Sequence, residues 1–299
     1  MGTHANRAIE KLRLLIVGGS GFLGQRLVPL AQPQFETAYT YYSRDSLQTN
    51  AGYSLDVRDR QAVRQLFQTW QPHVVIHAAG SDASPDMADV IVTGTDNVCA
   101  AANASGARLI FLSTDVVFDG QHAPYRESDA PQPIHAYGRA KAAAETVVAA
   151  LADYVIVRTS LIYDLQPGGH NFDWLLSALQ RKKPVTLFTD QWRNPIWAIT
   201  LCYALLELAR LDYMGVLHVA GIQPLTRAEF GLKMLDWWGI ADRETLSLGK
   251  TPSPEPGDTP RWPADCRLDV SRAAALLQTP LLGVDHVLQQ ARQKTYSLC

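Results

Sequence analysis

The sequence lacks paired thiols and long apolar runs. Its four cysteines, at positions 99, 202, 266 and 299, form no CxxC pair, so we expect neither a disulfide framework nor a zinc site. No run of about 18 apolar residues occurs, which predicts that the chain has no membrane span. Residues 1–11 are polar and lack the apolar stretch of a signal peptide. The cytoplasm is therefore the expected location.

An excess of one charge is also missing. The chain has 27 Lys and Arg against 29 Asp and Glu, a net charge of -2, and no long basic run. This balance argues against a nucleic-acid partner or an anionic membrane surface. With 299 residues, 47% of them hydrophobic, the chain is large enough for one sizeable α/β domain and a smaller second lobe.

Short apolar runs alternate with helical patterns over residues 1–160. This alternation is typical of βαβ units and predicts a doubly wound parallel sheet of the Rossmann type. Strands are expected at Leu12–Val17, Thr37–Tyr42, Val74–His77, Arg108–Ser113 and Tyr154–Thr159, and helices at Arg60–Trp70, Val90–Ala104 and Ala136–Leu151.

Beyond Thr159 the pattern is looser. We expect helices at Asn171–Gln180 and Ile196–Leu211, a strand at Val216–Val219, and an irregular proline-rich segment at Thr251–Pro263. The predicted division is a dinucleotide-binding domain of residues 1–165, to which residues 193–221 return. Residues 166–192 and 222–299 then form a smaller, C-terminal substrate lobe.

A glycine turn follows the first predicted strand and precedes a helical pattern. Glycines in the spacing GxxGxxG allow a tight turn, close approach of a pyrophosphate and packing of helix on strand. Glycine spacing alone is weak, but strand, turn and helix occur here in the required order. The predicted phosphate-binding residues are Gly18, Ser20, Gly21, Phe22, Leu23 and Gly24.

The second predicted strand ends without an acidic residue. An NAD site usually carries a carboxylate there for the ribose hydroxyls. The chain instead reads Tyr-Tyr-Ser-Arg over residues 41–44, with no acid before Asp45. Ser43 and Arg44 suit a 2′-phosphate, so NADP(H) is favoured over NAD(H). The alternative is that Arg44 is an ordinary solvated side chain.

Tyr137 and Lys141 are spaced to share one face of a helix. A free tyrosine has a pKa near about 10, and a neighbouring ammonium favours its phenolate, which suits proton transfer to a carbonyl oxygen. YxxxK alone is common by chance. Thr114 strengthens it, because it lies at the carboxyl end of a predicted strand, where ligands bind in such sheets, and its hydroxyl can hold the same oxygen. We predict Thr114, Tyr137 and Lys141 as the catalytic set.

In this order, these motifs resemble the extended short-chain dehydrogenase/reductases. More narrowly, Ser-Thr-Asp-Val-Val-Phe-Asp-Gly (113–120), Pro-Tyr-Arg-Glu (124–127) and Pro-Ile-His-Ala-Tyr-Gly (133–138) resemble the dTDP-4-dehydrorhamnose reductases. His-Val-Ala-Gly (218–221) and Arg-Leu-Asp (267–269) extend the likeness over almost the whole chain. Members of that family reduce the 4-keto group of a deoxysugar nucleotide with a nicotinamide cofactor.

The resemblance implies roles for further residues. Asp56 and Val57 would lie against the adenine, and Ala78, Ala79 and Gly80 would line the cofactor cleft. Structural explanations remain open: Asp56 as a cap for the helix near Arg60, and the Ala-Ala-Gly run as close packing. No metal is implied, and the superfamily suggests a homodimer. The substrate side would receive Asp115, Arg158 and Asn171, although Arg158 could pair internally and Asn171 is a good helix N-cap.

Two positions depart from that family. Val116 stands where a tyrosine is usual beside the reacting centre, and Trp262-Pro263 stands where Arg-Pro is usual. The acidic stretch of residues 81–86 is also altered. These positions face the substrate, so the substrate is less defined than the cofactor.

Two other interpretations stay open. The chain also resembles the regulatory β subunit of methionine adenosyltransferase, a protein that holds NADP and docks on an enzyme. An epimerase or dehydratase of the same superfamily is a third possibility. A dehydratase needs a second acid beside the threonine, however, where Asp115-Val116 offers one. A reductase ranks first because the Thr-Tyr-Lys set is intact.

Overall fold

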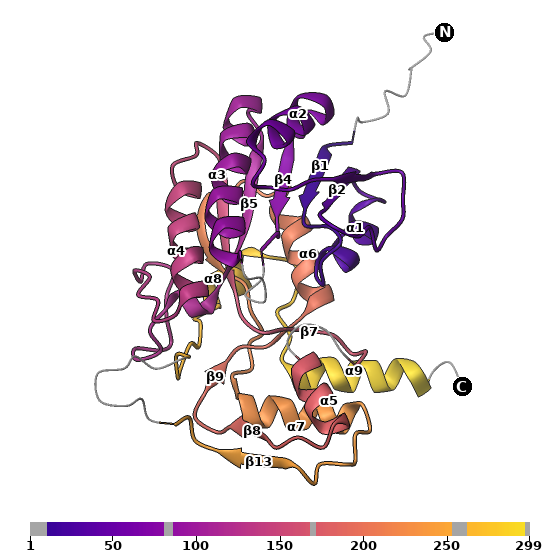
Figure 1. Cartoon of the computed structure of the whole chain (residues 1–299), viewed down its shortest axis with the longest axis vertical. Coiled ribbons are helices and arrows are strands. Elements are labelled where there is room, and N and C mark those ends of the chain that lie inside the picture. The colour runs from indigo at the N-terminus through magenta and orange to yellow at the C-terminus, as the bar shows by residue number, and fades with distance from the viewer. Residues whose placement is uncertain (1–10, 81–85, 168–171, 253–261, 297–299) are drawn as a thin grey trace.

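A parallel sheet of seven strands forms the centre of the computed structural model, which describes residues 11–80, 86–167, 172–252 and 262–296. The strand order β11-β6-β5-β4-β1-β2-β3 places β1 and β4 side by side at the centre (Figure 1). All neighbours are parallel. The strands are β1 Arg13–Val17, β2 Glu36–Tyr41, β3 Gly52–Ser54, β4 Val74–His77, β5 Arg108–Thr114, β6 Tyr154–Thr159 and β11 Gly215–His218.

Helices cover both faces of this sheet, which confirms the predicted doubly wound α/β fold. One apolar core joins α1 and α6 to the sheet, and a second joins α2, α3 and α4 to the opposite face. In β1, Leu14 and Ile16 belong to the first core, and Leu15 and Val17 to the second. A strand covered on both sides therefore needs an uninterrupted apolar run. The helices are α1 Gly24–Ala31, α2 Arg60–Trp70, α3 Met87–Ser105, α4 Ala136–Val148 and α6 Ala198–Leu208.

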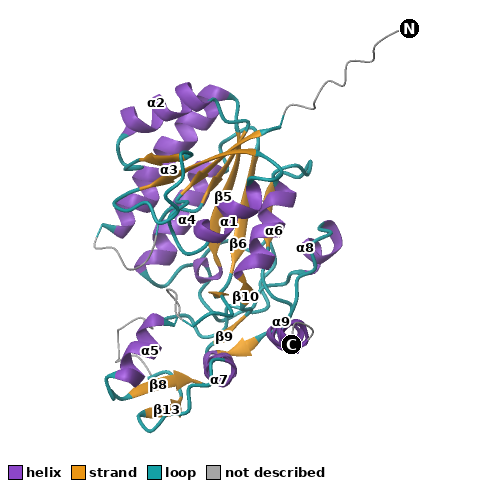
Figure 2. Cartoon of the chain, turned by 90° about the vertical axis from the view of Figure 1, so that its right-hand side faces the viewer, coloured by secondary structure: helices purple, strands orange, loops and turns teal. Residues whose placement is uncertain are grey.

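A smaller group of elements lies beyond the carboxyl ends of the strands (Figures 1 and 2). Its own core packs three helices against the parallel pair β8 and β13. Short strand pairs connect it to the rest of the chain: β7 with β10, and β9 with β12. Its elements are α5 Asp173–Gln180, α7 Arg227–Trp237, α9 Val284–Tyr296, β8 Val185–Phe188 and β13 Leu246–Gly249; the connecting strands are β7 Ile162–Tyr163, β9 Trp192–Arg193, β10 Ile196–Trp197 and β12 Leu225–Thr226.

The structure differs from the sequence-based expectation in several places. Ala273, Leu277 and Leu281, expected in the smaller lobe, pack in the core of the large sheet beside α8 (Ser271–Leu276). The expected helix from Ile196 begins two residues later, because the strand β10 comes first. Most of the proline-rich segment lies outside the described residues. None of the helices in the described part of the chain has the length and apolar character that a membrane crossing requires.

Asp59 begins α2 and offers a direct test of this local structure. Its side chain accepts hydrogen bonds from the backbone N–H groups of Gln61 and Ala62, at 2.9 and 3.0 Å. Loss of such a cap costs about 1 kcal/mol. We expect Asp59→Ala to lower the free energy of unfolding in urea by that amount. An unchanged midpoint and slope would contradict the assignment of the cap.

Candidate active site

The glycine turn lies where β1 and β4 adjoin, at the point where the strand order reverses. A Cβ added to Gly18 would lie 2.8 Å from the backbone nitrogen of Ala79, and Gly18 has a φ of +93° that favours glycine. A Cβ on Gly24 would lie 2.4 Å from the carbonyl oxygen of Gly18. Glycine is therefore required at both positions for the first helix and the strand β4 to approach the turn. Ligands bind in this crevice in open α/β sheets.

The crevice fits a dinucleotide in its backbone chemistry. The start of α1 follows directly from the turn, and the first N–H groups of a helix have no intrahelical acceptors. Ala78, Ala79 and Gly80 follow β4 on the opposite side, partly accessible. Gly80 has a φ of +108°, and a Cβ there would lie 2.8 Å from Ile91. The close approach of Gly18 to Ala79 and of Gly80 to Ile91 is the close packing that the sequence also allowed.

Ser43 and Arg44 are exposed just after β2. The loop that carries them is anchored by Asp45, whose carboxylate accepts a hydrogen bond from Tyr39 Oη at 2.9 Å. Ser46 Oγ donates to the carbonyl oxygen of Ser20 at 3.2 Å, which ties the loop to the glycine turn. Exposure fits both a 2′-phosphate site and a solvated surface.

Asp56 does not cap α2, because Asp59 does so. Its carboxylate instead binds Arg58, with Nη2 at 2.7 Å and Nε at 3.0 Å, and this hydrogen bonding lowers the pKa of Asp56. Val57 is buried under Gly94 of α3, where a Cβ would lie 2.5 Å from its side chain. Sequence reasoning overlooked Arg58, although the spacing of the two charges was visible.

The first turn of α4 places Tyr137 beside the end of β5. His135 caps the helix, and its Nδ1 accepts from the N–H of Gly138 at 3.1 Å. Gly138 packs so closely on η1 (Asp115–Val117) that a Cβ would lie 2.2 Å from the carbonyl oxygen of Val116. Tyr137 is thus held next to the segment that directly follows Thr114.

Lys141 lies one turn further, in the interior. It is 3% exposed, and its Nζ donates to the carbonyl oxygen of Leu112 at 3.1 Å. Nζ lies 6.0 Å from the centre of the Tyr137 ring and 4.7 Å from that of Phe111. Burial lowers the pKa of Lys141 to about 8, against the charge of Glu145, which raises it. Lys141 is therefore poised to change its protonation near neutral pH.

Thr114 is the last residue of β5 and is half-buried, with its Oγ1 3.3 Å from the N–H of Val116. Asp115 points into the protein: Ser160 Oγ donates to it at 2.6 Å, and Arg193 Nε lies 3.7 Å away. Burial raises the pKa of Asp115. Sequence reasoning missed Arg193 as the partner of Asp115.

Arg158 is paired internally, which was the structural alternative left open above. Its Nη2 lies 2.8 Å from Glu145, and both side chains are almost inaccessible to solvent. A guanidinium committed in this way is not free to bind substrate, so we leave Arg158 out of the substrate site. Asn171 lies outside the described residues.

The two departures from the resembled family lie near the reactive tyrosine. Val116 is buried in η1. Trp262 packs edge-on against His135, with ring centres 4.5 Å apart, and His135 is parallel to Tyr137 at 6.3 Å. An indole and an aliphatic residue therefore adjoin the first turn of α4 and its cap.

A nucleotide crevice beside a helix that carries a tyrosine and a buried lysine defines the class of extended short-chain dehydrogenase/reductases. The model of one family, the RmlD substrate binding domain, matches residues 12–296. The chain belongs to this family, as the resemblance in its sequence predicted.

Comparisons with individual proteins agree. The chain is 30% identical over 262 residues to a dTDP-4-keto-6-deoxy-D-glucose reductase of Streptomyces niveus, covering 82% of this chain and 83% of that protein. It is 28% identical over 289 residues to methionine adenosyltransferase 2 subunit beta of Xenopus laevis, with coverages of 88% and 82%. A hypothetical dTDP-4-dehydrorhamnose reductase of Sulfolobus tokodaii has a similar structure, with a TM-score of 0.77, 29% identity and coverages of 91% and 97%.

The buried lysine makes stability depend on pH. The unfolded chain holds the Lys141 proton up to a pKa near 10.5, whereas the folded protein releases it near 8. Between these values the unfolded state binds more protons, so stability rises with pH, by about 3 kcal/mol in total. We expect the unfolding free energy of the native chain to rise, relative to that of Lys141→Met, by about 3 kcal/mol from pH 8 to 10.5. A difference that stays flat in urea titrations would contradict the burial of a charged lysine.

Proposed function

We propose that the chain is an NADP(H)-dependent reductase of a keto group, most specifically the 4-keto group of a deoxysugar nucleotide. The observation that carries the proposal is the placement of Tyr137 and Lys141 on α4 against the end of β5, in a chain of this family. The relatives named as keto-sugar reductases support the reaction and the substrate class.

The side chains have distinct tasks in this proposal. Tyr137 gives a proton to the carbonyl oxygen, and Thr114 holds that oxygen with its hydroxyl. Lys141 would place a positive charge beside the tyrosine and help to hold the nicotinamide ribose. A nicotinamide bound next to these residues would supply the hydride to the carbonyl carbon.

The preference for NADP(H) rests on the end of β2. Ser43 and Arg44 are exposed there, and none of residues 41–44 carries a carboxylate. The carboxylate of Asp45 is itself engaged by Tyr39 and by the backbone N–H groups of Leu47 and Gln48. These hydrogen bonds occupy the Asp45 carboxylate within its own loop, and Arg44 is the group suited to a 2′-phosphate.

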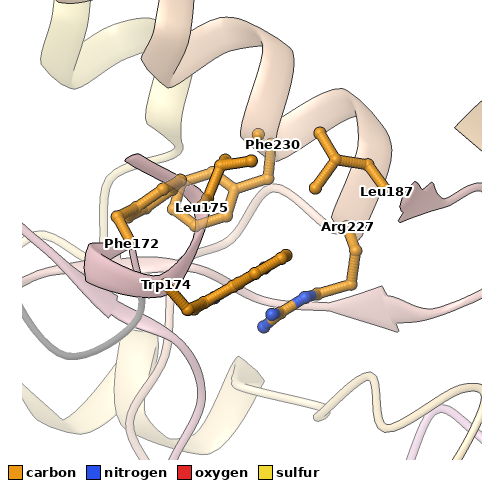
Figure 3. Close-up of a pocket in the computed structure, with 7 residues that line it drawn as sticks. Phe172, Trp174, Leu175, Leu187, Arg227 and Phe230 are labelled. Atoms are coloured by element: carbon orange, nitrogen blue, oxygen red, sulfur yellow. The ribbon is translucent and has the colours of Figure 1, made fainter. Parts of the chain in front are cut away.

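A small, mostly apolar hollow in the smaller lobe is where we expect part of the substrate to make contact (Figure 3). Trp174 of α5 and Arg227 of α7 approach each other from its two sides. Burial and the charge of Arg193 lower the pKa of Arg227 to about 10. A guanidinium at this hollow favours an anion such as a diphosphate. The hollow is lined by Phe172, Trp174, Leu175, Leu187, Arg227, Phe230 and Gly231.

A binding role without chemistry is the second candidate, because a subunit of another enzyme is among the relatives. The retained threonine, tyrosine and lysine favour the reductase, since a protein that only holds a nucleotide has no chemical need for a proton donor. Turnover separates the two candidates.

Tyr137→Phe tests the reaction. Removal of the proton donor is expected to lower kcat by about 100-fold or more. The measurement is loss of NADPH absorbance with a dTDP-4-keto-6-deoxyhexose. NADPH affinity, measured by its fluorescence, should stay within about twofold, since the phenyl ring still fills its place against His135.

A Tyr137→Phe variant with near-native turnover would contradict the assignment of the proton donor. A native chain that binds NADPH tightly but reduces neither this sugar nor other nucleotide-linked keto-sugars would favour the binding role.

Arg44→Ala tests the cofactor preference. Loss of one charge-assisted contact to the 2′-phosphate should weaken NADPH binding by about tenfold or more and leave NADH binding nearly unchanged. Arg64→Ala is the matched control, because this arginine is also exposed but lies on α2. Equal effects of Arg44→Ala on both cofactors would contradict a phosphate contact.

A further inference from the structure

Glu145 is a buried carboxylate one helical turn after Lys141, on the same side of α4. We propose that Glu145 is a positioning residue for the reduction. By binding Ser113 and Arg158 it holds α4, and with it Lys141, against the end of β5. This inference rests on the proposed function, since the reduction is what the positioning serves.

The contacts of Glu145 join three elements. Ser113 Oγ, on β5, donates to Oε1 at 2.5 Å, and Arg158 Nη2, on β6, donates to Oε2 at 2.8 Å. Arg158 Nε lies 3.1 and 3.2 Å from the two oxygens, so the pairing is bidentate. The guanidinium also lies over the ring of Phe118, 5.0 Å from its centre. Charge-assisted bonds of this kind fix direction as well as distance.

These contacts set the position of α4 along β5. Lys141 binds the carbonyl oxygen of Leu112, and Glu145 binds the next residue, Ser113. The residue after that is Thr114, which is proposed to hold the substrate oxygen. Because the three strand residues are consecutive, any slip of the helix moves the tyrosine and lysine relative to the threonine hydroxyl.

The charge of Glu145 acts in the same direction. Burial pulls the pKa of Lys141 down to about 8, and the carboxylate opposes that change. His77 faces the lysine as a neutral ring, because burial lowers its pKa to about 3. The elements around the lysine carry these other titratable or charged groups: Tyr137 and Arg139 on α4, His77 on β4, Asp89, Asp96 and Cys99 on α3, Arg108 on β5, Asp115 on η1, and Tyr154 and Arg158 on β6.

The test is Glu145→Gln, which keeps the shape and removes the charge. We expect kcat to fall by about tenfold or more with little change in KM for the sugar. We also expect the alkaline limb of the pH profile to move down by about one unit, because Lys141 now loses its proton more easily. The pH dependence of NADPH binding should move in the same way. The variant Ser113→Ala keeps the charge, so its alkaline limb should stay in place.

Glu207→Gln is the matched control for a structural effect. Its carboxylate also accepts several hydrogen bonds, from Gln278 and Thr279, but it lies on α6, across the sheet. If Glu145→Gln does not fold, the double variant Glu145→Gln/Arg158→Gln removes both buried charges. Replacing a whole buried ion pair costs far less stability than breaking it, so the alkaline limb of the pH profile can still be measured.

The outcomes separate the two proposals. An alkaline limb that stays in place in Glu145→Gln, with activity lost only in proportion to stability as in Glu207→Gln, overturns the positioning role and leaves the reductase intact. A different result is a native chain that shows no turnover, while the pH dependence of its NADPH binding shifts in Glu145→Gln. That result overturns the reductase and supports the placement of Lys141 by Glu145.

Discussion

The proposed catalytic residues, Thr114 on β5 and Tyr137 and Lys141 on α4, sit on two separate elements, and the close packing of α4 on the end of β5 is what brings them together. The contact begins at Gly138, where only a hydrogen fits against the carbonyl oxygen of Val116. It continues one turn later at Lys141, which binds the last part of the strand. A looser helix would leave Tyr137 and Thr114 in the same sequence order but without a common target, and positional errors of about 1 Å cost large factors in rate.

Charged side chains form two groups in the interior, one beneath α4 and one toward the smaller lobe. Beneath the helix, Glu145 and Arg158 neutralise each other almost out of contact with water. Toward the smaller lobe the balance differs, since one carboxylate, Asp115, faces two guanidinium groups, those of Arg193 and Arg227. The first pair joins α4 to β6 within the scaffold, and the second group places two guanidinium groups near one carboxylate.

Much of the larger domain was predictable from sequence, because its strands are buried on both faces and read as uninterrupted apolar runs. The bounds of β4 and β6 were predicted as observed. The short strands β8 and β13 gave no such signal: their pairing joins residues about 60 positions apart, and no local pattern encodes that partner. The docking of residues 273–281 on the large sheet was missed for the same reason.

The site residues also fall into those that a local sequence pattern reveals and those that depend on a distant partner. The glycine turn and the Tyr-Lys spacing are local patterns, so they could be found in the sequence. The partner of Arg158 could not, because a buried arginine and a substrate-binding arginine look alike until the position of Glu145 is known. Arg193 was hidden for a similar reason, since its role depends on Asp115, which is 78 residues earlier in the chain.

The central claim, direct reduction of a sugar-linked ketone by a bound nicotinamide, is tested most directly with deuterium. NADPH carrying deuterium at the transferable position of its nicotinamide would be mixed with the protein and a dTDP-4-keto-6-deoxyhexose, and the product examined by NMR. The account predicts one deuterium on the former carbonyl carbon, in a single configuration. A product without deuterium at that carbon, or deuterium retained entirely in the cofactor, would contradict it.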